Sequence, residues 1–313
     1  MKDKCFLCGN SAKSLYWDKL RYDEEGVVVK CKKCGLVRLE GAYDSYSDEF
    51  YEQEYTKRYF EGMKKNMDKL SNKFFPIQQG KISRMKKYLD KKHKVLEIGS
   101  SVGYTLKALS EMVNQVMGIE LNKEHAEYAY QVQGIETYSV PLKQCPFPEK
   151  YFDHVCIFQV LEHINDPVIF LNDIYKVLKV GGLLYIEIPT LQNPLISLYF
   201  IKEFKDFWFQ KPHLYYFTEE TLSKVIKKTL FKPIEMYPVM EVSIINHINW
   251  MINRKPMVSR KDCMNSGLPV KEENGGRDKF AEINDLFRDF DKIYKKKLEN
   301  MGYGDLIFCV CKK

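Results

Sequence analysis

Between residues 81 and 190, short apolar runs alternate with amphipathic stretches, and this alternation restricts the fold more than any other feature of the chain. The amphipathic stretch KISRMKKYL precedes the apolar run HKVLEIG, and helix-like and strand-like segments then alternate through VMGIE, IETYS and DHVCIFQ to GGLLYIEIP. Strands separated by helices form a parallel sheet that is covered on both faces. Right-handed crossovers bring the carboxyl ends of such strands to one edge, where ligands bind. We therefore expect an α/β fold with its site at that edge.

The segment VLEIGSSVG, from Val95 to Gly103, is the sharpest motif in the chain. A dinucleotide-binding turn would read G-x-G-x-x-G, whereas here the spacing is E-x-G-x-S-x-G. The carboxylate of Glu97 would repel a pyrophosphate but suits a cationic amino-acid ligand, which favours a sulfonium cofactor over NAD. Glu120 ends the next apolar run, where an acidic side chain can accept hydrogen bonds from both hydroxyls of a ribose.

Four motifs in order, VLEIGSSVG, GIE, FDHVCIFQVLEHINDP and VLKVGG, together resemble the class I S-adenosylmethionine-dependent methyltransferases. The resemblance covers roughly residues 80–235 and the closing strand near 305–311. It implies a Rossmann-like sheet of seven strands with the last strand antiparallel. It also implies S-adenosylmethionine as the cofactor.

The resemblance carries cofactor-binding roles onto matching positions of this chain. Its first motif would hold the methionine part of the cofactor, Glu120 the ribose, and Gln159 would lie beside the cofactor. The stretch Ser139-Val-Pro-Leu142 lacks the acidic residue that many relatives use for the adenine amino group, so we expect backbone near Leu142 to hold adenine. Ser101 also departs from the family pattern, since it replaces the middle glycine and narrows the pocket. The expected cofactor-binding residues are Glu97, Gly99, Ser101, Gly103, Glu120, Leu142 and Gln159.

Four of the nine cysteines lie in the first 34 residues, as Cys5-x-x-Cys8 and Cys31-x-x-Cys34, with 22 residues between the pairs. A two-residue spacer lets two thiolates of one turn reach a single tetrahedral ion, and a glycine follows each pair. The spacing predicts a Cys₄ zinc ribbon with a structural zinc ion, because four thiolates leave no open coordination position. Four unrelated buried cysteines or a redox pair are the alternatives. The other five cysteines are interpreted as packing residues.

Composition excludes several classes of protein. With 45% hydrophobic and 14% aromatic residues the chain is too apolar for intrinsic disorder, and 49 Lys+Arg against 42 Asp+Glu leave only a mild charge of +7. No apolar run reaches the ~18 residues of a membrane span, and the first residues have no signal-like core. We expect a cytoplasmic protein without a transmembrane segment.

The segments divide the chain into a zinc ribbon (1–40), a helical connector (41–80) and a methyltransferase domain (81–313) with insertions at 191–217 and 240–300. The aromatic residues of the first insertion could form a lid over an acceptor, or pack against the connector or a second subunit. Residues 254–279 are expected to be a loop. Apolar residues at three- and four-residue spacing then predict a helix over 280–299, which could support the lid or form the contact of a homodimer.

A cysteine knuckle before such a domain resembles bacterial enzymes that methylate sugars, nucleotide sugars and other small metabolites. The favoured function is therefore methyl transfer to a small-molecule or glycan-precursor acceptor, with His163 and His213 as candidate bases. A second hypothesis is an RNA methyltransferase that binds nucleic acid through the zinc ribbon. Residues 1–40 hold nine Lys/Arg against six Asp/Glu, which is a weak positive charge for binding phosphates. A non-catalytic cofactor-binding subunit is a third. The sequence leaves open which atom of the acceptor, oxygen, carbon or nitrogen, receives the methyl group.

Overall fold

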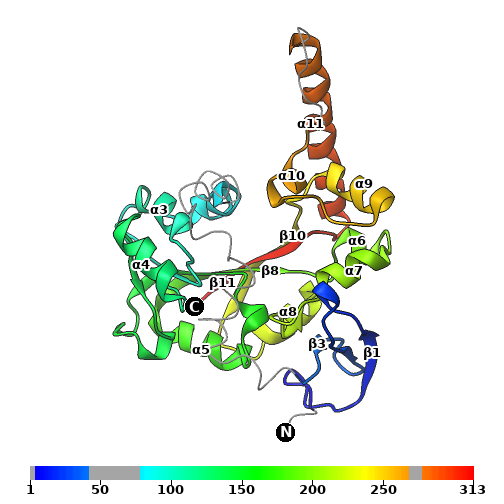
Figure 1. The fold of residues 1–313 in the computed structure, drawn as a ribbon. Coiled ribbons are helices and arrows are strands. Elements are labelled where there is room, and N and C mark those ends of the chain that lie inside the picture. The colour runs from blue at the N-terminus through cyan, green and yellow to red at the C-terminus, as the bar shows by residue number, and fades with distance from the viewer. Residues whose placement is uncertain (1–3, 42–77, 268–276) are drawn as a thin grey trace.

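The computed structural model describes residues 4–41, 78–267 and 277–313, and a seven-stranded sheet lies at its centre (Figure 1). The strand order is β10-β11-β8-β7-β4-β5-β6, and β11 alone runs antiparallel to its neighbours. This confirms the expected Rossmann-like α/β fold with an antiparallel last strand. The strands are β4 (Lys94–Ile98), β5 (Gln115–Ile119), β6 (Glu136–Tyr138), β7 (Phe152–Phe158), β8 (Leu178–Pro189), β10 (Lys232–Val239) and β11 (Leu306–Lys312).

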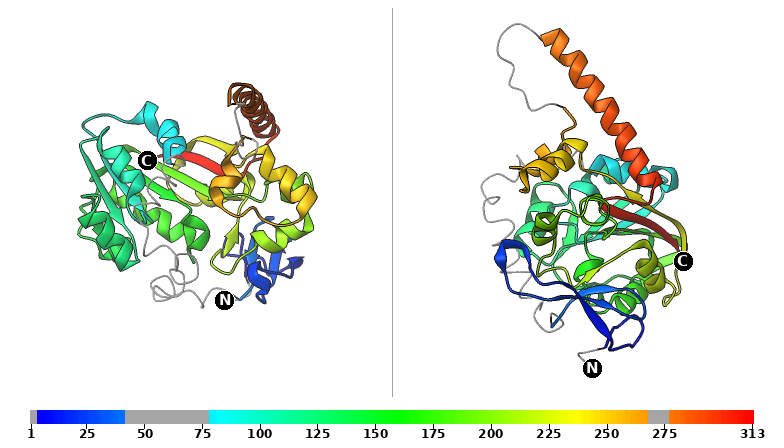
Figure 2. Two further views of the ribbon diagram at one scale, coloured as in Figure 1. Left: turned by 45° about the horizontal axis from the view of Figure 1, so that its top comes forward. Right: turned by 90° about the vertical axis from the view of Figure 1, so that its right-hand side faces the viewer.

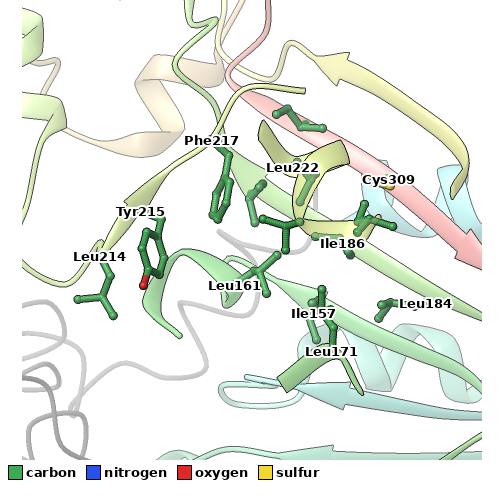
Figure 3. Packing of buried hydrophobic residues seen from close by; sticks show 14 of the residues in the cluster. Ile157, Leu161, Leu171, Leu184, Ile186, Leu214, Tyr215, Phe217, Leu222 and Cys309 are labelled. Carbon is green, nitrogen blue, oxygen red and sulfur yellow. The ribbon is translucent and has the colours of Figure 1, made fainter. Parts of the chain in front are cut away.

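Helices cover both faces of the sheet, which explains why its central strands carry buried apolar residues on both faces. On β4, Val95 belongs to the same buried cluster as Leu106 of α3, whereas Leu96 belongs with Leu171 of α5 to a second cluster. Figure 3 shows Leu171 in that second cluster, together with Ile157 of β7 and Leu184 and Ile186 of β8. Cys156, Cys309 and Cys311 are fully buried in the same cores, as expected, while Cys145 and Cys263 are partly exposed. The covering helices are a helix over 78–85, α3 (Tyr104–Ser110), α4 (Lys123–Gln131), α5 (Pro167–Val177) and α8 (Glu219–Ile226).

Local sequence signals set the helix starts beside the site. The Asp166 carboxylate accepts from the backbone N–H groups of Val168 and Ile169, and Pro167 occupies the first turn of α5. Such a cap satisfies N–H groups that the helix itself leaves without acceptors. Thr218 and Thr221 form a reciprocal capping box at the start of α8.

A second sheet contains the cysteine-rich segment and one strand from the first insertion. Its order is β1 (Lys13–Trp17), β2 (Val28–Cys31), β3 (Val37–Leu39) and β9 (Tyr215–Tyr216). β3 pairs with β9, so the N-terminal segment docks on the α/β body next to α8 (Figure 2). Phe6 stacks on Tyr215 with ring centroids 4.6 Å apart. The connector predicted over 41–80 lies outside the described residues except at its two ends.

The insertions pack around a small aromatic core. Phe204 and Phe207 both contact Trp250, with ring centroids 5.0 and 5.3 Å apart. Much of the aromatic stretch therefore packs against α9 and against the ribbon, contacts that the sequence did not indicate. The helices here are α6 (Pro194–Ser197), α7 (Lys202–Trp208), α9 (Ile244–Asn253), α10 (Arg260–Met264) and α11 (Arg277–Asn300).

The prediction of a loop over 254–279 is wrong in part, because α10 lies within that range. The Ser259 hydroxyl caps this short helix by accepting from the N–H of Asp262, a local signal that the surrounding Pro, Gly and Asn residues obscured. The helix expected over 280–299 is confirmed as α11, which projects from the body (Figures 1 and 2). Across the described ranges, every helix is too short or too polar to traverse a bilayer.

Candidate cofactor and acceptor site

The turn after β4 needs its glycines. Gly99 has φ +76°, and a Cβ atom there would lie 2.5 Å from Cγ2 of Val160. Gly103 has φ +81°, and its Cβ would lie 3.2 Å from that of Ala129. Both positions combine a left-handed backbone with close packing, so a side chain would strain the turn. Ser101, which replaces the usual middle glycine, adopts φ +49° despite its side chain.

Glu97 is buried beneath this turn with one carboxylate oxygen unsatisfied. Its side chain is 3% exposed, and Oε2 has no hydrogen-bond partner among the residues described. Burial raises the pKa of Glu97 to about 8, while the Lys81 ammonium and the Thr105 hydroxyl oppose the rise. A buried carboxylate that lacks a donor is costly to maintain. A cationic ligand at this position would satisfy it.

The Glu120 carboxylate is held by two turns at the same edge of the sheet. Its Oε2 accepts from the N–H of Ser101 at 2.8 Å, and its Oε1 accepts from the N–H of Asn122 at 2.9 Å. Burial raises the pKa of Glu120, and these two N–H groups oppose that rise. The side chain is thus oriented at the end of β5, where the sequence predicted it.

Gln159 and Leu142 lie at the same strand ends. Gln159 follows β7 directly and adopts φ +58°, and its N–H donates to the carbonyl of Glu187 at 2.7 Å. The next residue, Val160, packs against Gly99. Leu142 begins a single 3₁₀ turn after β6 and is nearly buried. The structure therefore brings the seven predicted cofactor residues to the carboxyl edge of β4–β7.

Sequence reasoning missed three charged residues behind this edge. The Glu187 carboxylate on β8 is fully buried, with Arg84 Nη2 2.6 Å from Oε2 and Lys81 Nζ 3.6 Å from Oε1. Lys81 and Arg84 project from the helix over 78–85, and the basic residues of KISRMKK were the only signal in the sequence. The pairing itself spans about a hundred residues and depends on tertiary structure.

Beyond the end of β7, the structure brings His163 and His213 together. Their ring centroids are 4.9 Å apart, and Nδ1 of His163 lies 2.7 Å from the carbonyl oxygen of Pro212. Burial lowers the pKa of His163 to about 4, and burial lowers that of His213 well below its usual value. Both imidazoles are therefore neutral at physiological pH.

Glu162, which the sequence did not single out, completes this cluster. It is 1% exposed, and neither carboxylate oxygen has a hydrogen-bond partner in the described part of the chain. Its Oε1 lies 3.9 Å from Nε2 of His163, and ligand-type atoms of Glu162, His163 and His213 all lie within 4.8 Å of one another. Burial raises the pKa of Glu162 to about 8, with the Glu187 carboxylate adding to the rise. Such a set can share a proton or hold a cation.

The segment that carries His213 is tied to the end of β7 and to the ribbon. The N–H of Leu214 donates to the carbonyl of Glu162 at 2.8 Å, and the N–H of Leu39 donates to the carbonyl of Leu214 at 3.0 Å. β9 follows directly. The Glu162–His163–His213 cluster thus rests on one strand of the cysteine-rich sheet.

The four N-terminal cysteines converge as their spacing predicted. The Sγ atoms of Cys5 and Cys34, and those of Cys8 and Cys31, are 3.5 Å apart, and all four lie within 4.8 Å of one another. Tetrahedral zinc with Zn–S bonds of ~2.3 Å separates its sulfurs by about 3.8 Å, so the arrangement fits the ion. The glycines after each pair adopt φ +71° and +82°, and their N–H groups donate to the carbonyls of Cys5 and Cys31.

Comparison with known protein families matches residues 96–186 to a family described as methyltransferase domain. A "Probable S-adenosylmethionine-dependent methyltransferase" of Mycolicibacterium smegmatis is 27% identical over 99 residues, which is 31% of this chain and 38% of that protein. An uncharacterized methyltransferase of Bacillus subtilis is 30% identical over 112 residues, 34% of this chain and 44% of the relative. The chain thus spans less than half the length of these relatives.

Solved structures show the same fold. A SAM-dependent methyltransferase of Thermotoga maritima aligns with a TM-score of 0.51 and 18% identity over 83% of this chain and 98% of that one. A SAM-dependent methyltransferase of Archaeoglobus fulgidus aligns with a TM-score of 0.50 and 18% identity over 79% of this chain and its own full length. Residues 96–186 are therefore a methyltransferase domain, set in a chain with the fold of the S-adenosylmethionine-dependent methyltransferases.

Proposed function

We propose that the protein transfers a methyl group from S-adenosylmethionine to an oxygen or carbon atom of a small polyhydroxylated acceptor, such as a sugar, a nucleotide sugar or another glycan precursor. The observation that carries this proposal is the pairing of two buried carboxylates at one sheet edge. Glu97 serves the cofactor and Glu162 serves the acceptor. Each lacks a hydrogen-bond donor that a bound ligand would supply.

On the cofactor side, the Glu97 carboxylate would accept from the ammonium group of the methionine moiety. Gly99 and Gly103 place no side chain in the turn above it, and Gly99, Ser101 and Gly103 all adopt left-handed backbone conformations there. Glu120, oriented by two backbone N–H groups, would accept from the ribose hydroxyls. Leu142 would border the adenine and Gln159 the reacting end of the cofactor.

S-adenosylmethionine supplies an electrophilic methyl group on a sulfonium sulfur. The residues of this chain have to align the acceptor in line with that methyl group and to receive a proton from a hydroxyl or carbon acid. We assign the proton acceptor to Glu162. Its pKa near 8 suits proton transfer near neutral pH, whereas burial keeps the pKa of His163 near 4.

The histidines, expected as bases from the sequence, would then position the acceptor. Nδ1–H of His163 donates to the carbonyl of Pro212, which leaves the lone pair of that ring on Nε2, toward Glu162. Nε2 of His213 lies 2.8 Å from Nε2 of Gln210. The two imidazoles and the carboxylate together offer several hydrogen-bonding groups, which suits an acceptor with more than one hydroxyl.

The cysteine cluster would hold a structural zinc ion. All four sulfurs are used and the site is buried apart from Cys8, so it offers no coordination position for a substrate. Because β3 of this segment pairs with β9, zinc binding would stabilise the backbone that carries His213. The ion would thereby support acceptor binding without taking part in chemistry.

The proposal is tested by transfer of a radiolabelled methyl group from S-adenosylmethionine to a panel of nucleotide sugars, free sugars, RNA and small amines. We expect label in a sugar-containing acceptor, and the Glu162→Gln variant should lower kcat about 10²–10⁴-fold with unchanged cofactor affinity. Label in RNA alone would refute the acceptor class. Full activity of Glu162→Gln would refute its role as the proton acceptor.

A further inference from the structure

A buried lysine lies behind the cofactor edge of the sheet. Lys81 is 8% exposed, and its side chain projects from the helix over 78–85 toward the strands. Its Nζ lies 3.6 Å from Oε1 of Glu187 and 4.8 Å from the centroid of the Phe158 ring. A lysine is almost never buried to this extent unless it is paired, because its ammonium loses its hydration. The charges around Lys81 therefore indicate what it does there.

The register of the sheet places Glu97 on the face that this helix covers. Glu97 on β4 is aligned with Cys156 on β7, and Phe158 on β7 is aligned with Glu187 on β8. Residues two apart on a strand point to the same side, so Glu97, Phe158 and Glu187 share one face. The helix that carries Lys81 belongs to one buried cluster with Cys156 and Phe158. The lysine and the cofactor carboxylate thus lie in the same layer of the protein.

Carboxylates outnumber cations around this layer in the described part of the chain. The carboxylates are those of Glu97, Glu120, Glu162, Glu187 and Glu241, and the cations are Lys81 and Arg84. The imidazoles of His163 and His213, which lie beside Glu162, are neutral at physiological pH. Arg84 is engaged by Glu187 at 2.6 Å and by Glu241 at 3.8 Å. Lys81 is then the cation that balances Glu97.

The pKa of Glu97 reflects this balance of charges. Burial raises that pKa to about 8, and the Lys81 ammonium is the strongest influence that lowers it, ahead of the Thr105 hydroxyl. The carboxylates of Glu120 and Glu187 add to the rise. Without the ammonium of Lys81, the ionised form of Glu97 would be disfavoured further, because burial and two like charges would act on it with less opposition.

We propose that Lys81 is a positioning residue for the cofactor, whose fixed ammonium allows Glu97 to ionise and to accept the ammonium group of the methionine moiety. This inference rests on the proposed cofactor role of Glu97 and extends it to a residue outside the strand ends. Glu187 fixes Lys81 by charge attraction, and the Phe158 ring fixes it by a cation–π contact. Lys81 acts through Glu97 rather than on the cofactor itself.

Calorimetric titration of the full chain with S-adenosylmethionine between about pH 6 and about pH 8.5 tests the proposal. Lys81→Gln keeps a hydrogen-bond donor for Glu187 but removes the charge, and its Kd at pH 7 should be about tenfold higher than that of the wild type. This ratio should shrink as pH rises, because Glu97 then ionises without the ammonium. Lys81→Arg keeps the charge and should retain the wild-type pH dependence. Lys86→Gln, at an exposed lysine of the same segment, is the control and should leave the Kd unchanged.

The pH dependence separates this role from the alternatives. A Kd that Lys81→Gln raises equally at every pH would mean a purely structural role, and a Kd that it lowers at every pH would mean that Lys81 only repels the cationic cofactor. Either result would overturn the proposal.

A second variant covers the case in which Lys81→Gln does not fold. Lys81→Gln with Glu187→Gln removes both partners of the ion pair. It should show a smaller change in the same direction, because Lys81 acts on Glu97 more strongly than Glu187 does, and no change would overturn the proposal. A wild-type chain that does not bind S-adenosylmethionine would refute both this inference and the proposed function. Normal cofactor binding without transfer to a sugar would refute only the proposed acceptor.

Discussion

Replacing Glu97 by Gln should have opposite effects on stability and on cofactor binding. The substitution keeps the size of the side chain but removes its ability to ionise. In the folded protein burial raises the pKa of Glu97 to about 8, whereas its ordinary value is 4.5. The unfolded chain therefore ionises this group between pH 4.5 and 8 while the folded chain keeps it protonated.

The sign of the stability effect follows from that difference. Folding binds a proton in this window, so the free energy of unfolding falls as pH rises from 4.5 to 8. At pH 7 the cost is 1.36 kcal/mol for each of the 2.5 pH units above 4.5, or about 3 kcal/mol as an upper bound. Glu97→Gln removes this cost. The variant without cofactor should gain up to about 3 kcal/mol at pH 7 and nothing at pH 4.5.

Cofactor binding should change in the other direction. A charge-assisted hydrogen bond from an ammonium group contributes about 1.5–3 kcal/mol, so the variant should bind S-adenosylmethionine at least ~10-fold more weakly. Because the ionised carboxylate is the binding form, wild-type affinity should increase with pH up to about 8, whereas the affinity of the variant should vary less.

Urea unfolding at pH 5 and pH 7.5 and calorimetric titration with the cofactor measure the two effects. Glu111→Gln, the same change at an exposed position, is the control and should alter neither. A Glu97→Gln variant that is less stable at pH 7, or that binds the cofactor as tightly as the wild type, would show that this carboxylate does not have the assigned environment or role.

Three further outcomes are expected. Gly99→Ala should destabilise the fold by about 1–3 kcal/mol in urea unfolding, because its φ is +76° and its Cβ would lie 2.5 Å from Cγ2 of Val160. Adding Val160→Ala to that variant should recover part of the lost stability. If no stability is recovered, the clash with Val160 is not the cause of the loss. Glu120→Ala should weaken cofactor binding at least ~10-fold by calorimetry, and an unchanged affinity would remove the ribose assignment. Protein purified without added metal should contain one zinc per chain by elemental analysis. Cys34→Ser should lose that zinc and reduce methyl transfer, with the affinity for the cofactor retained. A second metal ion that is present in the wild type and absent from His213→Ala would show that the Glu162–His163–His213 cluster binds a cation.

Local patterns were sufficient for the fold and for the sheet edge at which the predicted cofactor residues lie. The run VLEIGSSVG combines a buried strand with glycines at left-handed positions, and those requirements act within a few residues. The C-x-x-C turns are equally local, so the convergence of four cysteines followed from spacing alone. The α10 helix was missed because its cap at Ser259 is embedded in a stretch of loop-forming residues.

The sequence by itself determined the order of strands and helices in the central α/β segment, the glycine turn and the cysteine cluster, because periodicity, backbone conformation and short spacings are properties of neighbouring residues. Only the tertiary structure decided that Glu162 meets His213 across fifty residues, that Arg84 meets Glu187 across a hundred, and that β9 completes the cysteine-rich sheet. Burial and long-range packing set these contacts. They arise where loops from different strands meet at one sheet edge, and no local pattern encodes which loops those are.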